Sequence, residues 1–377
     1  MDPFEGHDRM KKSGHFKTPL RFLPNFQKGK TVPHPLSIKE SRIQKMITLY
    51  QQDNAAESAN ICKEKEISER WIVSDDTEHH SRVLIFGRET IPFPILLDRF
   101  GELILGKEHI REFGPNLKIL MKILETHPDP QKGSSSVFVH PAKGHLLYSP
   151  KIKIWKGEGK IYLGWNKDTS EKRIRTFAQN GTLELDLNPI QMEHSHPVFI
   201  PGGVPYALRS GTLVLEWSSV PEKNHSKEEC ILYDRTDGKI PSPRAENIET
   251  ALELIKQADL FHKTEDFFCK SRELFTDGSG NRISLVLENA ELFVEEIEIT
   301  TSMELSTEMR GFPLFMEKGK VEVIQDGVCL DILFEGDERF FPCCLGKVTL
   351  ISKGEQPALM QKWYAPFSWM LEDNLIA

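Results

Sequence analysis

The sequence predicts a mainly β protein in which one barrel unit occurs twice and a helical insert interrupts the first copy. Short apolar runs, alternating with polar residues and separated by glycine and proline, fill most of the chain from residue 136 onward. Residues 92–125 instead carry apolar side chains every three or four positions, which is typical of helices. Residues 198–204 (VFIPGGV) share their pattern with residues 339–345 (RFFPCCL), and this internal repeat indicates two copies of one unit.

The N-terminal part is a polar arm that covers residues 1–65. It is rich in lysine and glutamine and lacks the periodic apolar face of a packed segment. We expect residues 1–16 and 33–64 to be poorly ordered. The island at 19–26 (PLRFLPNF) is apolar enough to dock on the folded body.

Ordered structure is expected to begin near residue 66, where Trp71 and Val73 alternate with polar neighbours as in a half-buried strand. Two further helices are expected. The first covers about 171–180, because a capping box precedes an apolar face and Asn-Gly follows it, and the second covers 245–258. The predicted division is an arm at 1–65, a first barrel at 66–245 with its insert at 92–125, and a linking helix with a second barrel at 246–377.

The composition excludes several classes of partner. With a formal net charge of -8, nothing favours nucleic acid, and an anionic ligand needs a locally basic site. Residues 151–175 offer such a site, with eight Lys or Arg against three Asp or Glu, although half of these side chains would simply face water on alternating strands. The chain shows neither a signal peptide nor a membrane span, so we expect a cytoplasmic protein that does not enter membranes.

Eight segments between residues 19 and 366 follow one another in a familiar order: PLRFLPNF, ERWIVSD, FPILLDRFGELILG, SVFVHP, KIYLGW, VFIPGG, GTLVLEW and LMQKWYAP. Together they resemble the type I phosphomannose isomerases, which are zinc enzymes of the cupin superfamily. That family interconverts mannose 6-phosphate and fructose 6-phosphate. The resemblance implies two cupin-like barrels of the jelly-roll type and a sugar phosphate, such as mannose 6-phosphate, as ligand.

The same resemblance implies that most of the zinc ligands are lost. The family holds zinc with the Gln and His of Q-x-H, a later Glu, and the His of I-P-A-G-x-x-H-A. Here Phe138 replaces the amide, His140 is retained, and Tyr206 replaces the distal His. The Glu falls on Tyr148 or Lys153, according to where the gap is placed. Zinc needs about four N, O or S donors. We therefore expect no cofactor, with zinc present only if the family activity is retained.

Two weak catalytic candidates also come from the resemblance. The family's Arg in Y-R-L-Y-D aligns with Ile231, and Arg235 could substitute only if the strand slips. Lys151 matches the family's Lys two residues before the ligand Glu, but only in the alignment that puts Lys153 at that Glu.

Other polar residues have two readings each. Glu216 resembles a Glu of the family's barrel interior, or is the outward residue of an alternating strand. His140 alone is a ligand or a hydrogen-bonded pocket histidine. The cluster at 193–196 (EHSH) could rebuild a metal site, because His194 and His196 would share one strand face, or it is a solvated loop. The segment 78–80 (EHH) is likewise either part of a metal site or a solvated turn.

Three functional hypotheses follow. The first is a pseudoenzyme of the phosphomannose isomerase type, with weak or no isomerase activity, that binds a sugar phosphate through His140, Lys153, Tyr206 and Glu216. The second is an active aldose-ketose isomerase with a rebuilt or absent metal site, in which Lys151, His140 and Tyr206 supply acid-base chemistry. The third is a scaffold that uses the N-terminal arm to dock on an unknown protein partner. The sequence leaves enzymatic activity open.

Overall fold

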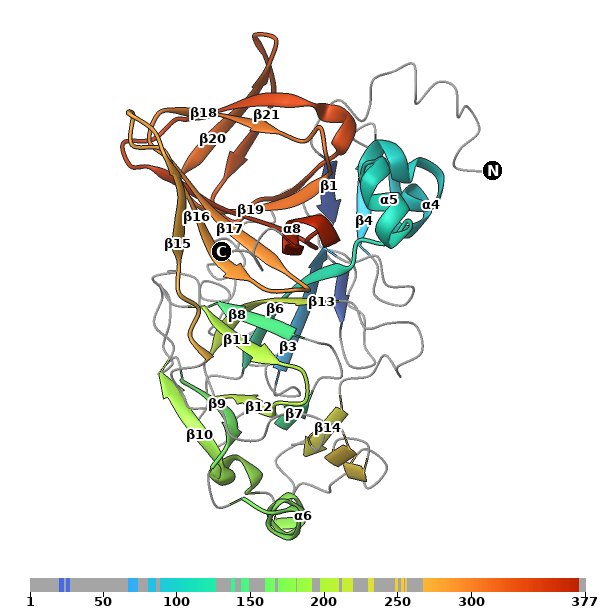
Figure 1. Cartoon of the computed structure of the whole chain (residues 1–377), viewed down its shortest axis with the longest axis vertical. Helices are drawn as coiled ribbons and strands as arrows, with labels where there is room; N and C mark the ends of the chain where they lie inside the picture. The colour runs from blue at the N-terminus through green and yellow to red at the C-terminus, as the bar shows by residue number, and fades with distance from the viewer. Residues whose placement is uncertain are drawn as a thin grey trace, which may run out of the picture.

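The structure, a computed structural model, has two cupin-like barrels stacked along its long axis, with helices beside them (Figure 1). It describes residues 20–23, 25–27, 67–73, 81–85, 89–126, 137–139, 144–148, 160–166, 169–180, 182–191, 197–209, 212–219, 230–233, 248–249, 252–253, 255 and 267–372. The segments 1–16 and 33–64, expected to be poorly ordered, lie outside the described residues, as does the predicted boundary at 245/246. The fold class predicted from the sequence is confirmed.

The first barrel consists of two antiparallel sheets that enclose an apolar interior. In spatial order, the first sheet contains β11 (Val198–Pro201), β8 (Gly144–Tyr148), β13 (Leu213–Ser219), β6 (Ile119–Thr126), β3 (Ile67–Val73) and β2 (Asn25–Gln27). The facing sheet contains β10 (Leu187–Gln191), β9 (Lys160–Trp165), β12 (Tyr206–Leu208), β7 (Val137–Val139) and β14 (Cys230–Tyr233). Both sheets contribute to one buried cluster, for example Leu163 and Tyr206 from one and Val198 and Val214 from the other.

The second barrel follows the same plan. Its larger sheet contains β15 (Arg272–Thr276), β16 (Arg282–Glu288), β17 (Phe293–Ile299), β24 (Ala358–Tyr364), β19 (Phe312–Lys318), β22 (Glu338–Phe341), β1 (Leu20–Leu23), β4 (Arg82–Ile85) and β5 (Glu89–Pro92). The facing sheet contains β18 (Ser302–Ser306), β23 (Lys347–Ser352), β20 (Lys320–Gln325) and β21 (Val328–Phe334). The apolar island of the N-terminal arm supplies a strand to each barrel, β1 to the second and β2 to the first.

The internal repeat is a repeat of topology. The order β11-β8-β13-β6-β3 in the first barrel corresponds strand for strand to β22-β19-β24-β17-β16 in the second. The two repeat motifs lie on corresponding strands: in β11 Pro201 stands opposite Gly144 at the start of β8, and in β22 Phe341 stands opposite Phe312 at the start of β19. VFIPGGV and RFFPCCL therefore lie on topologically corresponding strands, with a register that differs by one residue at the motif.

The helical insert is shorter than the sequence predicts. Helices α4 (Phe93–Ile104) and α5 (Lys107–Phe113) are present, but Ile119–Thr126 is strand β6 and not helix, so the helical prediction is wrong for residues 119–125. Ile119, Leu120 and Met121 are all buried, because one face of β6 meets the barrel interior and the other meets the second barrel. A strand buried on both faces loses its alternation and then looks like a buried helix.

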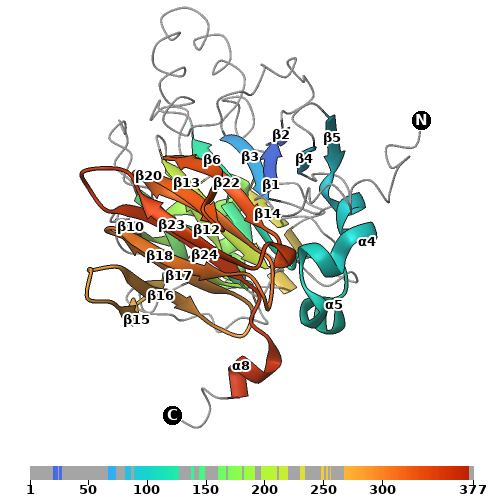
Figure 2. The same cartoon turned by 90° about the horizontal axis from the view of Figure 1, so that it is seen from above.

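The insert is expected to pack against the first barrel, whereas ring and hydrogen-bond contacts among the described residues join it to the second. The rings of Phe93 in α4 and Phe340 in β22 lie 5.6 Å apart. The backbone N–H of Gly311 donates to the Leu105 carbonyl at 3.1 Å. Figures 1 and 2 show α4 and α5 beside the stacked sheets, near the second barrel. Nothing in the local periodicity of 92–125 indicates which barrel this helical surface will cover.

This contact makes a specific stability prediction at Gly311. A Cβ added there would lie 2.0 Å from the Ile104 carbonyl oxygen and 2.7 Å from Cε1 of Phe340. Because backbone atoms cannot move aside cheaply, Gly311→Ala is expected to destabilise the fold by about 1–3 kcal/mol. Chemical denaturation measures the loss. Gly327→Ala offers a contrast, since its Cβ would meet nothing within 4 Å although its φ is +78°. A smaller loss for Gly311→Ala than for Gly327→Ala would contradict this account.

The helix predicted near 171–180 is confirmed as α6 (Glu171–Asn180), which buries Ile174 and Ala178. It covers the outer face of the five-stranded sheet, together with Ile248, Leu252 and Ile255 from the region where the second helix is expected. Among the described residues, no helix is long and apolar enough to cross a membrane.

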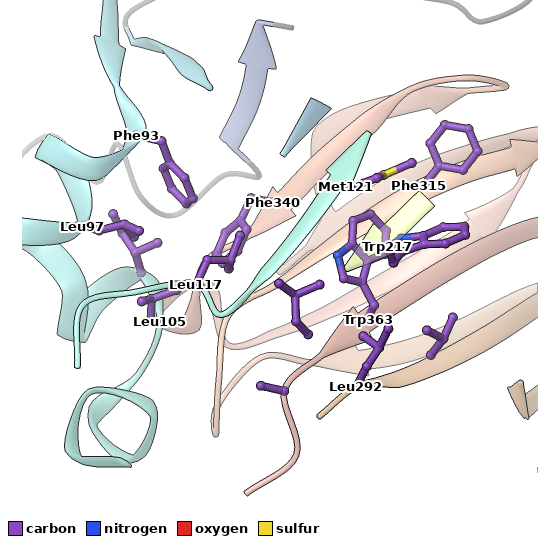
Figure 3. Packing of buried hydrophobic residues seen from close by; sticks show 14 of the residues in the cluster. Phe93, Leu97, Leu105, Leu117, Met121, Trp217, Leu292, Phe315, Phe340 and Trp363 are labelled. Atoms are coloured by element: carbon purple, nitrogen blue, oxygen red, sulfur yellow. The ribbon is translucent and has the colours of Figure 1, made fainter. Parts of the chain in front are cut away.

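The two barrels meet through one continuous buried cluster. Leu215 and Trp217 of β13 point away from the first barrel's interior and pack with Phe315 and Trp363 of the second barrel. The rings of Trp217 and Trp363 lie 5.7 Å apart in an edge-to-face arrangement, and Phe340 extends the cluster toward α4 (Figure 3). The two tryptophans come from the equivalent strands β13 and β24, so the repeated unit meets its own copy at this point.

Candidate functional site

Three positions from the sequence motifs, Phe138, Tyr206 and Ile231, lie on neighbouring strands of one sheet of the first barrel. Tyr206 in β12 stands directly opposite Phe138 in β7, and Phe138 stands directly opposite Ile231 in β14. On the other side, Tyr206 stands opposite Leu163 in β9. Directly opposite residues of antiparallel strands share a face of the sheet. These positions therefore form a single row across four neighbouring strands.

The described part of this row belongs to the apolar interior. Tyr206 and Leu163 are buried, at 1% and 0% exposure, in the cluster that fills the barrel. Leu208 lies on the same face of β12, whereas Ala207 packs on the opposite side against the α6 layer. The period of two in the strand fixes this separation. Tyr206 thus lies inside the barrel, as its position in the motif implies.

This row does not fit zinc. The metal needs about four N, O or S donors. The row offers a phenol at Tyr206 and hydrocarbon side chains at positions 138, 163 and 231. Within the part of the chain that the structure describes, no group of three or more His, Cys, Asp or Glu is placed to hold a metal ion. His140 and the segments 78–80 and 193–196 lie outside that part, and so do Lys151, Lys153 and Arg235.

Tyr148 occupies a different face from Tyr206. In β8, Tyr148 stands opposite Leu215, which packs in the cluster between the barrels. Its neighbour Leu147 stands opposite Glu216. Of the two alignments for the missing Glu, the one on Tyr148 therefore puts that position opposite Leu215. Lys153 lies outside the described residues.

Glu216 is a buried polar group on the sheet that faces the row. It is 0% exposed and lies on the same side of β13 as Val214, a residue of the barrel interior. The alternation with Leu215 and Trp217, which face the second barrel, leaves Glu216 on the inner side. Of its two readings, the inward one is therefore the one observed.

Lys122 is a further polar position that no sequence motif singles out. The register of β6 and β13 places it directly opposite Glu216. The corresponding strands of the second barrel, β17 and β24, place Glu295 opposite Lys362, and there the Nζ of Lys362 lies 2.9 Å from the Oε2 of Glu295. The repeat thus places a Lys and a Glu directly opposite each other at corresponding strand positions in both copies, with the two residue types exchanged. Comparing LEW at 215–217 with QKW at 361–363 could have revealed it.

The described arginines of the basic segment 151–175 are engaged on the outer surface. Arg173 pairs with the buried Asp186 at 2.6 Å. Arg175 pairs with Glu249 at 2.5 Å and with Glu171 at 2.8 Å. Both arginines belong to α6, which covers the outside of the sheet. They fix the helix layer, and they do not supply cations to the barrel interior.

Comparisons with known proteins place the fold. A scan against protein-family models gives no match, and neither does a search of curated proteins. The solved structure of mannose 6-phosphate isomerase from Bacillus subtilis superposes with a TM-score of 0.65 at 16% identity, over 92% of this chain and 99% of that one. A variant of phosphomannose isomerase from Salmonella typhimurium gives 0.62 at 12% identity, over 93% and 100%. At these identities the similarity is one of fold over nearly the whole chain.

Proposed function

We propose that this chain is a phosphomannose-isomerase-like protein with a degenerate zinc site and with weak or no isomerase activity, which binds a sugar phosphate such as mannose 6-phosphate. The observation that carries the proposal is the row of Tyr206, Phe138 and Ile231. The resemblance assigns an imidazole, an amide and a guanidinium to these positions. A phenol, a phenyl ring and an alkyl group provide neither the metal ligands nor the cation.

Loss of the imidazole, the amide and the guanidinium affects catalysis more than it affects ligand binding. Aldose-ketose isomerisation moves a proton between neighbouring carbons, and it needs a base together with polarisation of a carbonyl group. Binding a sugar phosphate needs only hydrogen-bonding groups and a cation inside a sheltered pocket. His140, Lys153, Tyr206 and Glu216 are the proposed binding residues. A protein located in the cytoplasm would encounter sugar phosphates in that compartment.

Metal analysis and turnover of the purified full chain test the proposal. We expect less than stoichiometric zinc in the protein and no measurable conversion of mannose 6-phosphate when zinc is added. Calorimetry should detect binding of mannose 6-phosphate, and the affinity should be lower in Glu216→Gln. Restoring two donors with Phe138→Gln and Tyr206→His is expected not to restore turnover, because the carboxylate ligand of the zinc site is still missing. Stoichiometric zinc together with chelator-sensitive turnover would overturn the proposal.

A second candidate function is an active isomerase with a rebuilt or absent metal site, and the Glu216–Lys122 register favours it. Glu216 is buried, and its strand position stands opposite that of Lys122. A carboxylate and a lysine are groups that can exchange protons with a bound sugar. Lys151 and Arg235 are its other candidate catalytic residues. Chelator-resistant turnover that is lost in both Glu216→Gln and Lys122→Met would establish this function. Turnover that survives in either variant would exclude this pair as its acid and base.

A further inference from the structure

Arg310 occupies an unusual setting in the second barrel. It lies in the turn between β18 and β19 and is only 8% exposed. Its guanidinium carbon lies 3.5 Å from the ring centre of Phe367 and 4.6 Å from that of Tyr364. Both rings come from the C-terminal part of the chain, where β24 ends and α8 (Ser368–Glu372) begins. The guanidinium therefore makes a cation–π contact with each of the two rings.

Most of the donors of this guanidinium are unused. It carries five N–H groups in a planar fork. One on Nη1 donates to the Ala365 carbonyl at 2.5 Å, and one on Nη2 donates to the Met370 sulfur, a weak acceptor, at 3.4 Å. Among the described residues, the other N–H groups have no acceptor, and no carboxylate lies within ion-pairing distance.

The two carboxylates whose charge reaches Arg310 are bonded to other groups. Glu112 at the end of α5 accepts the backbone N–H of Ser368 at 2.7 Å. Glu295 accepts Lys362 at 2.9 Å and also the hydroxyl of Tyr364. Among the described residues, neither carboxylate forms an ion pair with Arg310, although a buried cation normally has such a direct partner.

Burial acts against the charge of Arg310. A second cation, Lys362, whose side chain is 14% exposed, lies over the same Tyr364 ring at 4.9 Å and pairs with Glu295 at 2.9 Å. Burial lowers the pKa of Arg310 to about 10, which shows that its surroundings disfavour the charged form, although it stays charged at neutral pH. An anion at the unused donors would offset this cost.

We propose that Arg310 is the centre of a binding site for a phosphoryl group of a small molecule, separate from the first barrel. A guanidinium fork matches two oxygens of a tetrahedral oxyanion, and the contacts with Phe367 and Tyr364 restrain its position. The rim of the site includes Trp369, which is 45% exposed and stacks on Phe367 with ring centres 6.0 Å apart. Its open face offers a flat surface to the rest of the ligand.

Titration of the full chain with inorganic phosphate, followed by calorimetry and by thermal unfolding, tests this site. We expect phosphate to raise the Tm of the wild-type protein above its value in sodium chloride of equal ionic strength. Arg310→Gln should weaken this binding by at least about tenfold, because a charge-assisted bidentate contact is lost. Arg282→Gln is the matched control. It removes an exposed arginine that pairs with Glu298 at 2.7 Å, and it should leave phosphate binding unchanged.

Glu112→Gln keeps the test decisive if Arg310→Gln fails to fold. This variant retains the acceptor for Ser368 and removes one negative charge near the site, so phosphate should bind about two- to fivefold more tightly. Equal affinities in the wild type and Glu112→Gln, or in the wild type and Arg310→Gln, would overturn the proposal. Mannose 6-phosphate binding that depends on Glu216 is a separate readout, so failure of the first-barrel proposal is distinguishable from failure of this one.

Discussion

Trp217→Ala is expected to destabilise the protein by about 3–5 kcal/mol, as large-to-small changes of buried aromatic residues do. Trp217 is 0% exposed and packs edge-to-face on Trp363, at the centre of the cluster that joins the two barrels. Urea denaturation of the variant measures the loss, and Val328→Ala, at a position that is 61% exposed, should cost less than about 0.5 kcal/mol.

The same pair offers a sharper measurement. Trp217→Ala, Trp363→Ala and the double variant form a cycle that isolates the coupling between the rings, for which we expect about 0.5–1.5 kcal/mol. Strict additivity would mean that the barrels do not depend on this contact. A loss below about 1 kcal/mol for Trp217→Ala would contradict the central position of this residue in the cluster.

Acidification is expected to cost about 3 kcal/mol of stability through His109 alone. His109 in α5 is 4% exposed, its Nε2 lies 2.7 Å from the carbonyl oxygen of Asn116, and its ring meets the edge of Phe113. Burial lowers its pKa from 6.5 to about 4. The bond to Asn116 opposes this shift, while the charges of Arg310 and Lys118 add to it. His109 is therefore neutral in the folded protein at neutral pH.

The sign follows from proton binding. Between pH 6.5 and 4 the unfolded chain protonates this imidazole and the folded chain does not, so the free energy of unfolding falls as the pH falls, and the loss is complete near pH 4. Denaturation at several pH values in this window measures the slope. His109→Gln should remove this contribution, while carboxylates that titrate in the same range affect both proteins alike. Identical slopes in the two proteins would contradict the lowered pKa.

The sequence predicts which residue types occupy the candidate site, but it does not predict how these residues are arranged in space. Tyr206, Phe138 and Ile231 were each identified from motif positions, since a motif gives the residue at a position. That they form one row depends on hydrogen bonding between strands far apart in the chain. Lys122 was missed for the same reason, because only the register of β6 against β13 places it opposite Glu216.

By itself, the sequence determined the β content, the repeat and the helix at 171–180, because alternation, turn residues and caps are local properties. Only the tertiary structure decided that 119–126 is a strand, that the helical insert covers the second barrel, and that Arg310 lies between Phe367 and Tyr364. In each case the deciding contact joins segments distant in sequence. A run of residues buried on both faces carries no period that would reveal its partner.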